Sequence, residues 1–300
     1  MEEFARSDLA AECGGEREGE GIRVRKSESG GCRILQVQVR SSEAAKRIGK
    51  PEGCYVTLDC GNIRMLEENE FDRVRCALSV EIREMAERMC GKRVGGQFSV
   101  LVAGLGNAEI TADAIGPETV RRMAVTRHLR RLDHALFSTV GLCEISALVP
   151  GVLGQTGLET VELVRGAVKA ASPDLVVAVD ALASRSVERL ATTVQLSDTG
   201  IHPGSGIGNS RKALNAETVG VPVMALGVPT VVDSSTLVYD ALRRAGYEPQ
   251  YFSGELHQAL KEGKNFFVSP KEIDLLVSSV AVLLAGALEK AFTVRDGEFS

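Results

Sequence analysis

Residues 100–117 read VLVAGLGNAEITADAIGP, and this stretch decides the fold that we predict for the chain. It opens with a run of apolar residues, 100–102, which is typical of a strand buried on both faces. Two glycines then allow a sharp turn. Asp113 follows, just before Pro117, which suits the first turn of a helix. We therefore expect an acid on a short loop beyond the carboxyl end of a core strand, the edge at which open α/β sheets bind ligands.

A second stretch repeats this arrangement. Residues 174–180 read DLVVAVD, an apolar strand that ends in the carboxylate of Asp180. Asp113 and Asp180 could therefore face one crevice, as a pair of catalytic carboxylates does. An aspartate that follows a strand also commonly caps the next helix. The spacing alone leaves both interpretations open.

The remaining pattern predicts one α/β domain, a doubly wound sheet with helices on both faces. Further strands are predicted at residues 33–40, 55–58, 192–196, 221–226 and 230–232. Helices are predicted at 70–90, from 117 through the basic segment 127–131, after a capping box at 156–159, after Asp233, and from a second capping box at 269–272 to about residue 292. Residues 1–20 are polar and glycine-bearing, and we expect them to be flexible.

The composition narrows the class of protein. The 300 residues are 44% hydrophobic and 25% charged, which is ordinary for a soluble globular protein. The formal net charge of −5 gives no basic footprint, so we expect no direct nucleic-acid binding. The apolar run 275–288 is too short to cross a bilayer, and we expect no membrane partner. The seven cysteines, without a C-x-x-C pair, favour reduced thiols in a cytoplasmic protein.

A glycine-rich loop, residues 198–209 (DTGIHPGSGIGN), offers further candidates. Its first three residues match the D-T-G triplet of pepsin-like proteases, but those enzymes are mostly β and bring two triplets together, so we interpret the match as chance. The loop either shapes a substrate cleft or only turns the chain. The candidates for a cleft, or for donors to an oxyanion, are Asp198, His202, Gly204, Gly206 and Gly208.

Several strings of the chain resemble the germination proteases of spore-forming bacteria. They are residues 104–117, 150–160 (PGVLGQTGLET), 180–186 (DALASRS), 197–209 and 267–274 (FVSPKEID), and they occur in the family's order over nearly the whole chain. The resemblance implies an atypical aspartic endopeptidase with an α/β fold that is similar to the hydrogenase-maturation peptidases. Asp113 and Asp180 match the two catalytic aspartates of the family, so we expect no cofactor and no metal.

The resemblance also implies substrates and a life cycle. Members of the family are cytoplasmic enzymes of the spore core that start the degradation of small acid-soluble spore proteins during germination. They are made as inactive homotetrameric zymogens that shorten their own N-termini. Here residues 1–20 are accordingly a candidate propeptide, and residues 21–300 the peptidase domain.

The N-terminus contains two candidate self-cleavage positions. The family's substrates carry an acid before the cut, then a large apolar residue, then alanine. Glu3 and Phe4 fit this pattern, as do Asp8 and Leu9, because an alanine follows each pair. We expect slow removal of the first three or eight residues in mild acid.

Two other functions remain open. One is a metal-dependent peptidase of the hydrogenase-maturation type, in which Asp113, Asp180 and His202 would be the ligands. The other is a binding protein without enzymatic activity on the same fold, in which the two aspartates serve as helix caps.

Overall fold

A computed structural model describes residues 7–14, 18–202, 212–248, 251–263 and 266–294. Within these residues the strands form one nine-stranded sheet in the order β1-β2-β3-β7-β8-β6-β4-β5, with β9 paired to β8. The strands are β1 (Ile22–Ser29), β2 (Cys32–Val39), β3 (Gly53–Asp59), β4 (Ser99–Gly104), β5 (Glu144–Leu148), β6 (Leu175–Ser184), β7 (Thr193–Ser197), β8 (Val223–Asp233) and β9 (Phe267–Val268). The neighbours β5, β4, β6 and β8 are parallel, and the other pairs are antiparallel.

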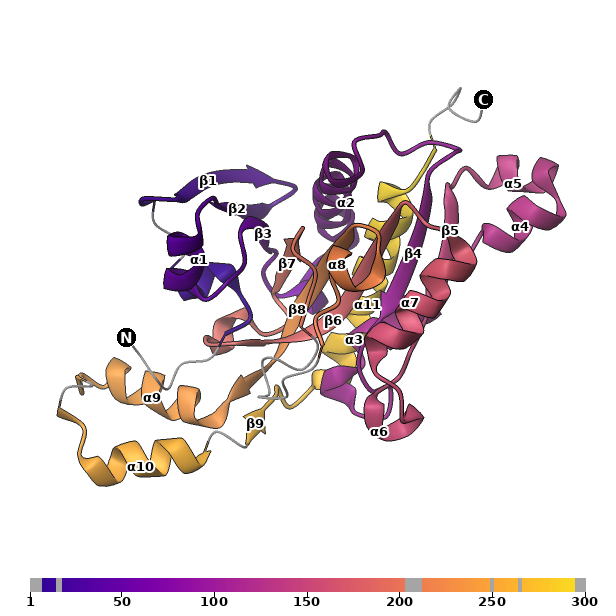
Figure 1. Cartoon of the computed structure of the whole chain (residues 1–300). Helices are drawn as coiled ribbons and strands as arrows, with labels where there is room; N and C mark the ends of the chain where they lie inside the picture. Colours follow the sequence, from indigo (N-terminus) through magenta and orange to yellow (C-terminus); the bar gives the residue numbers. More distant parts are fainter. Residues whose placement is uncertain (1–6, 15–17, 203–211, 249–250, 264–265, 295–300) are drawn as a thin grey trace.

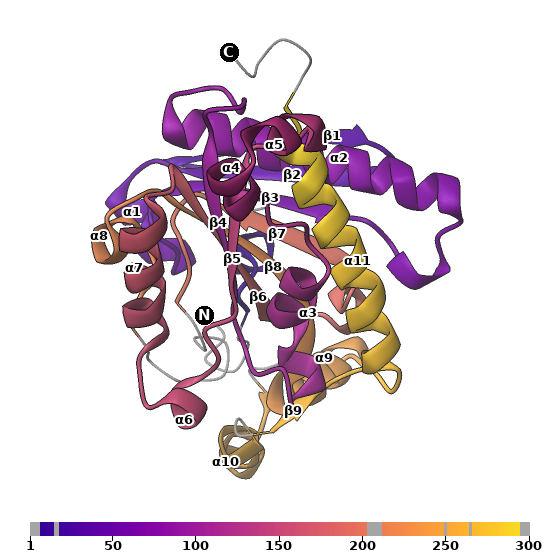
Figure 2. The same ribbon diagram turned by 90° about the vertical axis from the view of Figure 1, so that its right-hand side faces the viewer.

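Helices cover both faces of the sheet, as Figures 1 and 2 show. The α-helices are α1 (Ser42–Ile48), α2 (Glu68–Cys90), α3 (Ile115–Arg121), α4 (Arg127–Leu132), α5 (His134–Val140), α6 (Leu153–Thr156), α7 (Thr160–Ala171), α8 (Ala216–Val219), α9 (Ser234–Arg244), α10 (Gly254–Gly263) and α11 (Ile273–Ala291). Helices α2, α3 and α11 pack on one face, and α7 and α8 pack on the other. The predicted α/β class, with a sheet between two helical layers, is confirmed.

The long hydrophobic helices form where their apolar residues recur every three or four positions. In α11, Val280, Leu283 and Leu284 are fully buried against the core, while Ile273 and Leu276 are partly buried. These five residues of the predicted closing helix therefore pack towards the core. In the described residues no helix is both long and apolar enough to cross a membrane.

The helix predicted from residue 117 through residue 131 is wrong. The chain instead forms α3 and α4, with a turn between them. Thr126 explains the break, because its buried hydroxyl donates to the carbonyl of Cys143 and accepts from the backbone N–H of Ile145. These bonds attach the turn to β5, and a continuous helix could not make them.

Both predicted capping boxes are also wrong. Thr156 ends the short helix α6, and Glu159 is the N-cap of α7, with its backbone N–H bonded to the Glu162 side chain. Helix α11 begins after Glu272 without a side-chain cap. A four-residue pattern predicted that a helix starts nearby, but it missed the residue at which it starts.

Two strands are longer than predicted. Strand β6 runs past Asp180 to Ser184, and the two expected pieces near residue 226 are the single strand β8. Pro229 lies inside β8, where the pairing with β6 shifts register next to Leu182. Such an irregularity accommodates a proline without a ladder hydrogen bond. Asp180 therefore lies within a strand, and not after one.

Candidate active site

One cavity of about 430 Å³ brings the predicted acids together. Asp113 and Asp180 both line it, and so do Asp8, Tyr55 and His202. It lies at the carboxyl ends of the parallel strands, where open α/β sheets bind ligands. Along β6, Asp180 shares its face with Ala178, which packs under α7, because alternate residues of a strand point to one side. The cavity therefore lies on the face of the sheet against which α7 packs, next to the part of that face that α7 covers.

Asp113 lies in the single-turn 3-10 helix η3 (Thr111–Asp113), between β4 and α3. Its Oδ2 accepts a 2.7 Å hydrogen bond from the backbone N–H of Asn107. Gly106 makes this loop feasible, because its φ is +108° and a Cβ there would lie 2.0 Å from the carbonyl oxygen of Asp113. The carboxylate is thus oriented by the loop that carries it.

A close approach between strand and helix places this loop at the cavity. A Cβ on Gly104 would lie 2.4 Å from the carbonyl oxygen of Gly116, so α3 starts directly against β4. The backbone N–H of Leu105 donates to the carbonyl of Val179, one residue before Asp180. These contacts bring the loop of Asp113 next to the strand of Asp180.

Asp180 is only 6% exposed and comes from the central strand β6. Its Oδ1 accepts a 2.9 Å hydrogen bond from the backbone N–H of Ala181. Its neighbour across the sheet is Gly227 of β8, which also lines the cavity. A Cβ at Gly227 would lie 2.6 Å from the side chain of Leu182, so only glycine fits at that position.

Neither aspartate has the geometry of a helix cap. The N-cap of α3 is Ala114, without a side-chain cap bond, and Asp180 lies inside a strand. By contrast, Asp233 does cap α9 as predicted, accepting from the N–H groups of Ser235 and Thr236. The interpretation of Asp113 and Asp180 as caps loses its structural basis.

The glycine-rich loop is only partly described. His202 lines the cavity and is exposed, whereas Gly204, Gly206 and Gly208 lie outside the described residues. The carboxylate of Asp198 is directed elsewhere, with its Oδ1 2.7 Å from the backbone nitrogen of Cys54 on β3. Asp198 therefore has a structural role, because it links β3 to the end of β7.

The N-terminal segment differs from the flexible stretch that was expected. Leu9 and Ala10 are fully buried, and residues 10–13 form the 3-10 helix η1 (Ala10–Cys13). Asp8 forms two 2.9 Å hydrogen bonds with the backbone of Ala183 on β6. The N–H of Asp8 donates to the Ala183 carbonyl, and Oδ2 of Asp8 accepts from the Ala183 N–H. The prediction of flexibility is corrected for residues 7–14. Glu3 and Phe4 lie outside the described residues.

The sequence pattern missed several residues that line the cavity. Tyr55 donates its hydroxyl to the carbonyl of Pro51, and burial raises its pKa to about 12. Lys50 and Gln195 also line the cavity. Tyr55 and Lys50 come from β3 and the loop before it, and no motif marked them, because only the long-range pairing of β3 with β7 brings them to this edge.

Within the described part of the chain, no group of three or more His, Cys, Asp or Glu side chains is arranged to bind a metal ion. The chemistry that the cavity offers lies in its carboxylates. Carboxyl groups can accept a proton from a bound molecule or donate one to it.

Fold and cavity define an α/β protein with a carboxylate-lined cleft at the carboxyl ends of its parallel strands. A family model described as germination protease matches residues 3–248. The chain is 38% identical to the germination protease of Caldanaerobacter subterraneus subsp. tengcongensis, over 95% of this chain and 93% of that protein. It is 36% identical to the germination protease of Bacillus subtilis, over 92% and 87%. The chain belongs to the germination protease family and is a peptidase.

Among the solved structures found to be similar is the [NiFe] hydrogenase maturation protease HycI from Thermococcus kodakarensis, at 18% identity and a TM-score of 0.31. The match covers 64% of this chain and 94% of that one.

Proposed function

We propose that this chain is an endopeptidase that starts the degradation of small acid-soluble spore proteins during germination, with Asp113 and Asp180 as a dyad that activates water. One observation carries the proposal: both aspartates line one cavity of about 430 Å³, although they come from separate elements of a chain in the germination protease family. Neither acid is used as a helix cap, which removes the structural role that the sequence pattern had left open for them.

The mechanism is general acid–base hydrolysis. The ionised aspartate takes a proton from water as the water oxygen attacks the scissile carbonyl carbon. The protonated aspartate donates a hydrogen bond to the carbonyl oxygen, and later supplies a proton to the leaving amine. The pair starts with one proton and ends with one, so the cycle balances.

The N-terminal segment supports a zymogen that processes itself. Asp8 lines the same cavity as the dyad, and Leu9 beside it is fully buried. A segment in that position competes with a substrate for the cavity. We therefore propose that residues 1–20 contain the propeptide, with cleavage after Glu3 or Asp8, and that the protein is a homotetramer in the cytoplasm of the spore core. Light scattering of the purified chain tests the tetramer.

The decisive assay is cleavage of a purified small acid-soluble spore protein by the full chain after incubation in mild acid. We expect cleavage beside acidic residues, detected by mass spectrometry, which continues after exhaustive chelation. Activity that is lost on chelation and restored by a metal ion would favour the metal-dependent alternative. Failure to cleave this substrate or any other acidic peptide would refute the peptidase proposal.

A further inference from the structure

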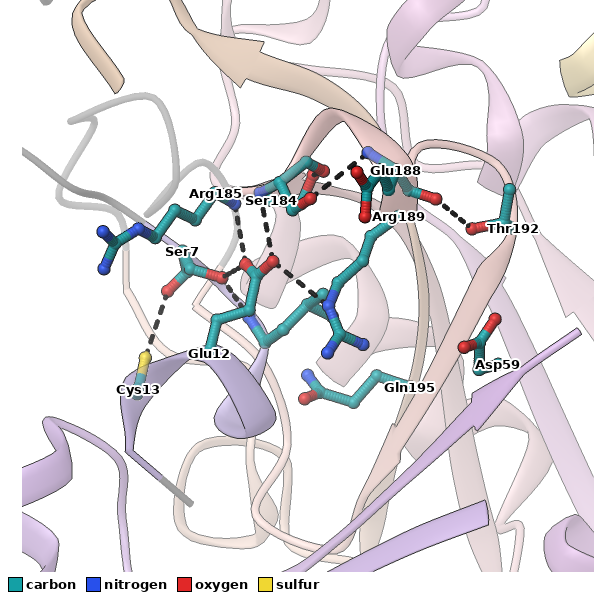
Figure 3. A network of polar contacts seen from close by, with 12 residues as sticks. Ser7, Glu12, Cys13, Asp59, Ser184, Arg185, Glu188, Arg189, Thr192 and Gln195 are labelled. Atoms are coloured by element: carbon teal, nitrogen blue, oxygen red, sulfur yellow. Dashed lines mark hydrogen bonds and ion pairs between the residues drawn. The ribbon is translucent and has the colours of Figure 1, made fainter. Parts of the chain in front are cut away.

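Glu12, on η1, places its carboxylate in a pocket formed by distant residues (Figure 3). Its Oε2 accepts a 2.7 Å hydrogen bond from the backbone N–H of Arg185, and its Oε1 accepts one of 3.1 Å from that of Ser186. The Nε atom of Arg189 lies 3.2 Å from Oε1, and the Glu12 side chain is only 7% exposed. Two backbone N–H groups and a guanidinium are donors suited to a carboxylate.

These donors belong to the body of the protein and follow the strand that carries Asp180. Arg185 and Ser186 directly follow β6, the strand that carries Asp180, and Arg189 ends the 3-10 helix η4 (Val187–Arg189). The three donors are therefore attached to the strand of Asp180, and the Ser7 hydroxyl of the N-terminal segment donates a further 2.5 Å hydrogen bond to Oε2 of Glu12.

The same segment presents a second acid four residues earlier. Asp8 pairs with the backbone of Ala183 and lines the dyad cavity. Between the two acids, the side chain of Gln195 on β7 forms hydrogen bonds with the backbone on either side of Leu9. Its Nε2 donates to the carbonyl of Asp8, and its Oε1 accepts from the N–H of Ala10. Hydrogen bonds to the backbone of a bound segment hold it without regard to most of its side chains.

We propose that the pocket of Arg189 and the backbone N–H groups of Arg185 and Ser186 is a specificity subsite for an acidic side chain of the substrate, and that Glu12 occupies it in the uncleaved chain. The ligand class is a peptide with two acids four residues apart, the first in the place of Asp8. This inference rests on the proposed peptidase function. Arg189 also lines a second cavity, of about 450 Å³.

Two synthetic peptides test the subsite. Both copy residues 5–15 with Cys13→Ser, and one also carries Glu12→Gln. Binding is measured by fluorescence anisotropy to the full chain with Asp113→Asn, which prevents cleavage, and Glu12→Gln, which weakens occupation by the chain's own segment. We expect the peptide with glutamate to bind about tenfold or more tightly than the one with glutamine, because a charged hydrogen bond replaces a neutral one.

Adding Arg189→Gln to the protein should bring the ratio of the two affinities close to one, and Arg189→Lys should restore part of it. A purely structural role of Arg189 would change both affinities alike. Arg244→Gln is the matched control, because Arg244 forms an exposed ion pair with Glu188, and it should keep the original ratio. Equal affinities, a ratio that persists without Arg189, or no binding of either peptide would overturn the proposal.

Cleavage of the two peptides by the chain with native Asp113 separates this proposal from the peptidase function. A binding preference without any cleavage would refute the proposed activity and leave the subsite standing. Cleavage of both peptides with equal kcat/KM would refute the subsite and leave the activity standing.

Discussion

The hydroxyl of Thr230 donates a 2.6 Å hydrogen bond to the carbonyl oxygen of Ala112. Thr230 is 1% exposed and lies on β8, the strand next to that of Asp180. This bond attaches the loop of Asp113 to the sheet, and so it fixes one acid relative to the other.

Thr230→Val should therefore lower cleavage through a loss of positioning. We expect a fall of about tenfold or more in kcat, because small displacements of a reacting group are costly. The free energy of unfolding should fall by about 1–3 kcal/mol, because the carbonyl of Ala112 loses a buried partner. Thr230→Ser keeps the hydroxyl and should restore most of the activity. Equal activity of the valine and serine variants would show that the bond is irrelevant to catalysis.

The closing helix provides a prediction about stability. Leu283 of α11 is fully buried in the core formed with α2 and α3, so Leu283→Ala should cost about 2–5 kcal/mol in a urea titration. The neighbouring Val282 is 47% exposed, and Val282→Ala should change the free energy of unfolding by less than about 0.5 kcal/mol. Similar losses for both variants would contradict the packing of this helix.

Buried groups predict a loss of stability in alkali. Burial raises the pKa of the Cys143 thiol to about 12, from 9.0 in the absence of burial. The unfolded chain therefore loses this proton at lower pH than the folded chain does, and stability should decline as the pH rises from about 9 towards 12. Cys143→Ala should weaken this decline, as followed by thermal melts across that range. The same slope in both proteins would mean that Cys143 does not contribute.

Self-processing can be followed by intact-mass spectrometry in mild acid. We expect slow loss of the first three or eight residues, because a half-protonated dyad is favoured as the pH falls. Leu9 is buried, so cutting after Asp8 needs local opening of the docked segment and should be the slower event. The Asp113→Asn protein should keep its full mass. An unchanged mass in a chain that cleaves added substrate would show that it does not process itself.

The sequence predicted the parts of this site that depend on local pattern. The apolar runs before Asp113 and Asp180 form buried strands, and their shared sheet edge brings both acids to one cavity. It failed where distant residues decide the structure. Glu12 meets Arg189 across 177 positions of chain, and the polar N-terminus gave no sign of this contact. The position of Tyr55 likewise follows from the pairing of β3 with β7, which no local pattern encodes.

The dyad is tested most directly by removing one carboxylate at a time. Asp113→Asn and Asp180→Asn should each abolish cleavage of a small acid-soluble spore protein, because an amide cannot exchange the required proton. Two controls should keep measurable activity: Asp198→Asn, whose amide oxygen can still accept from Cys54, and Asp133→Asn, because asparagine caps α5 as well as aspartate does. The measurement is kcat/KM on folded protein, verified by circular dichroism. Loss of activity in the first two variants alone is the predicted result, and substantial activity in either of them would contradict the account.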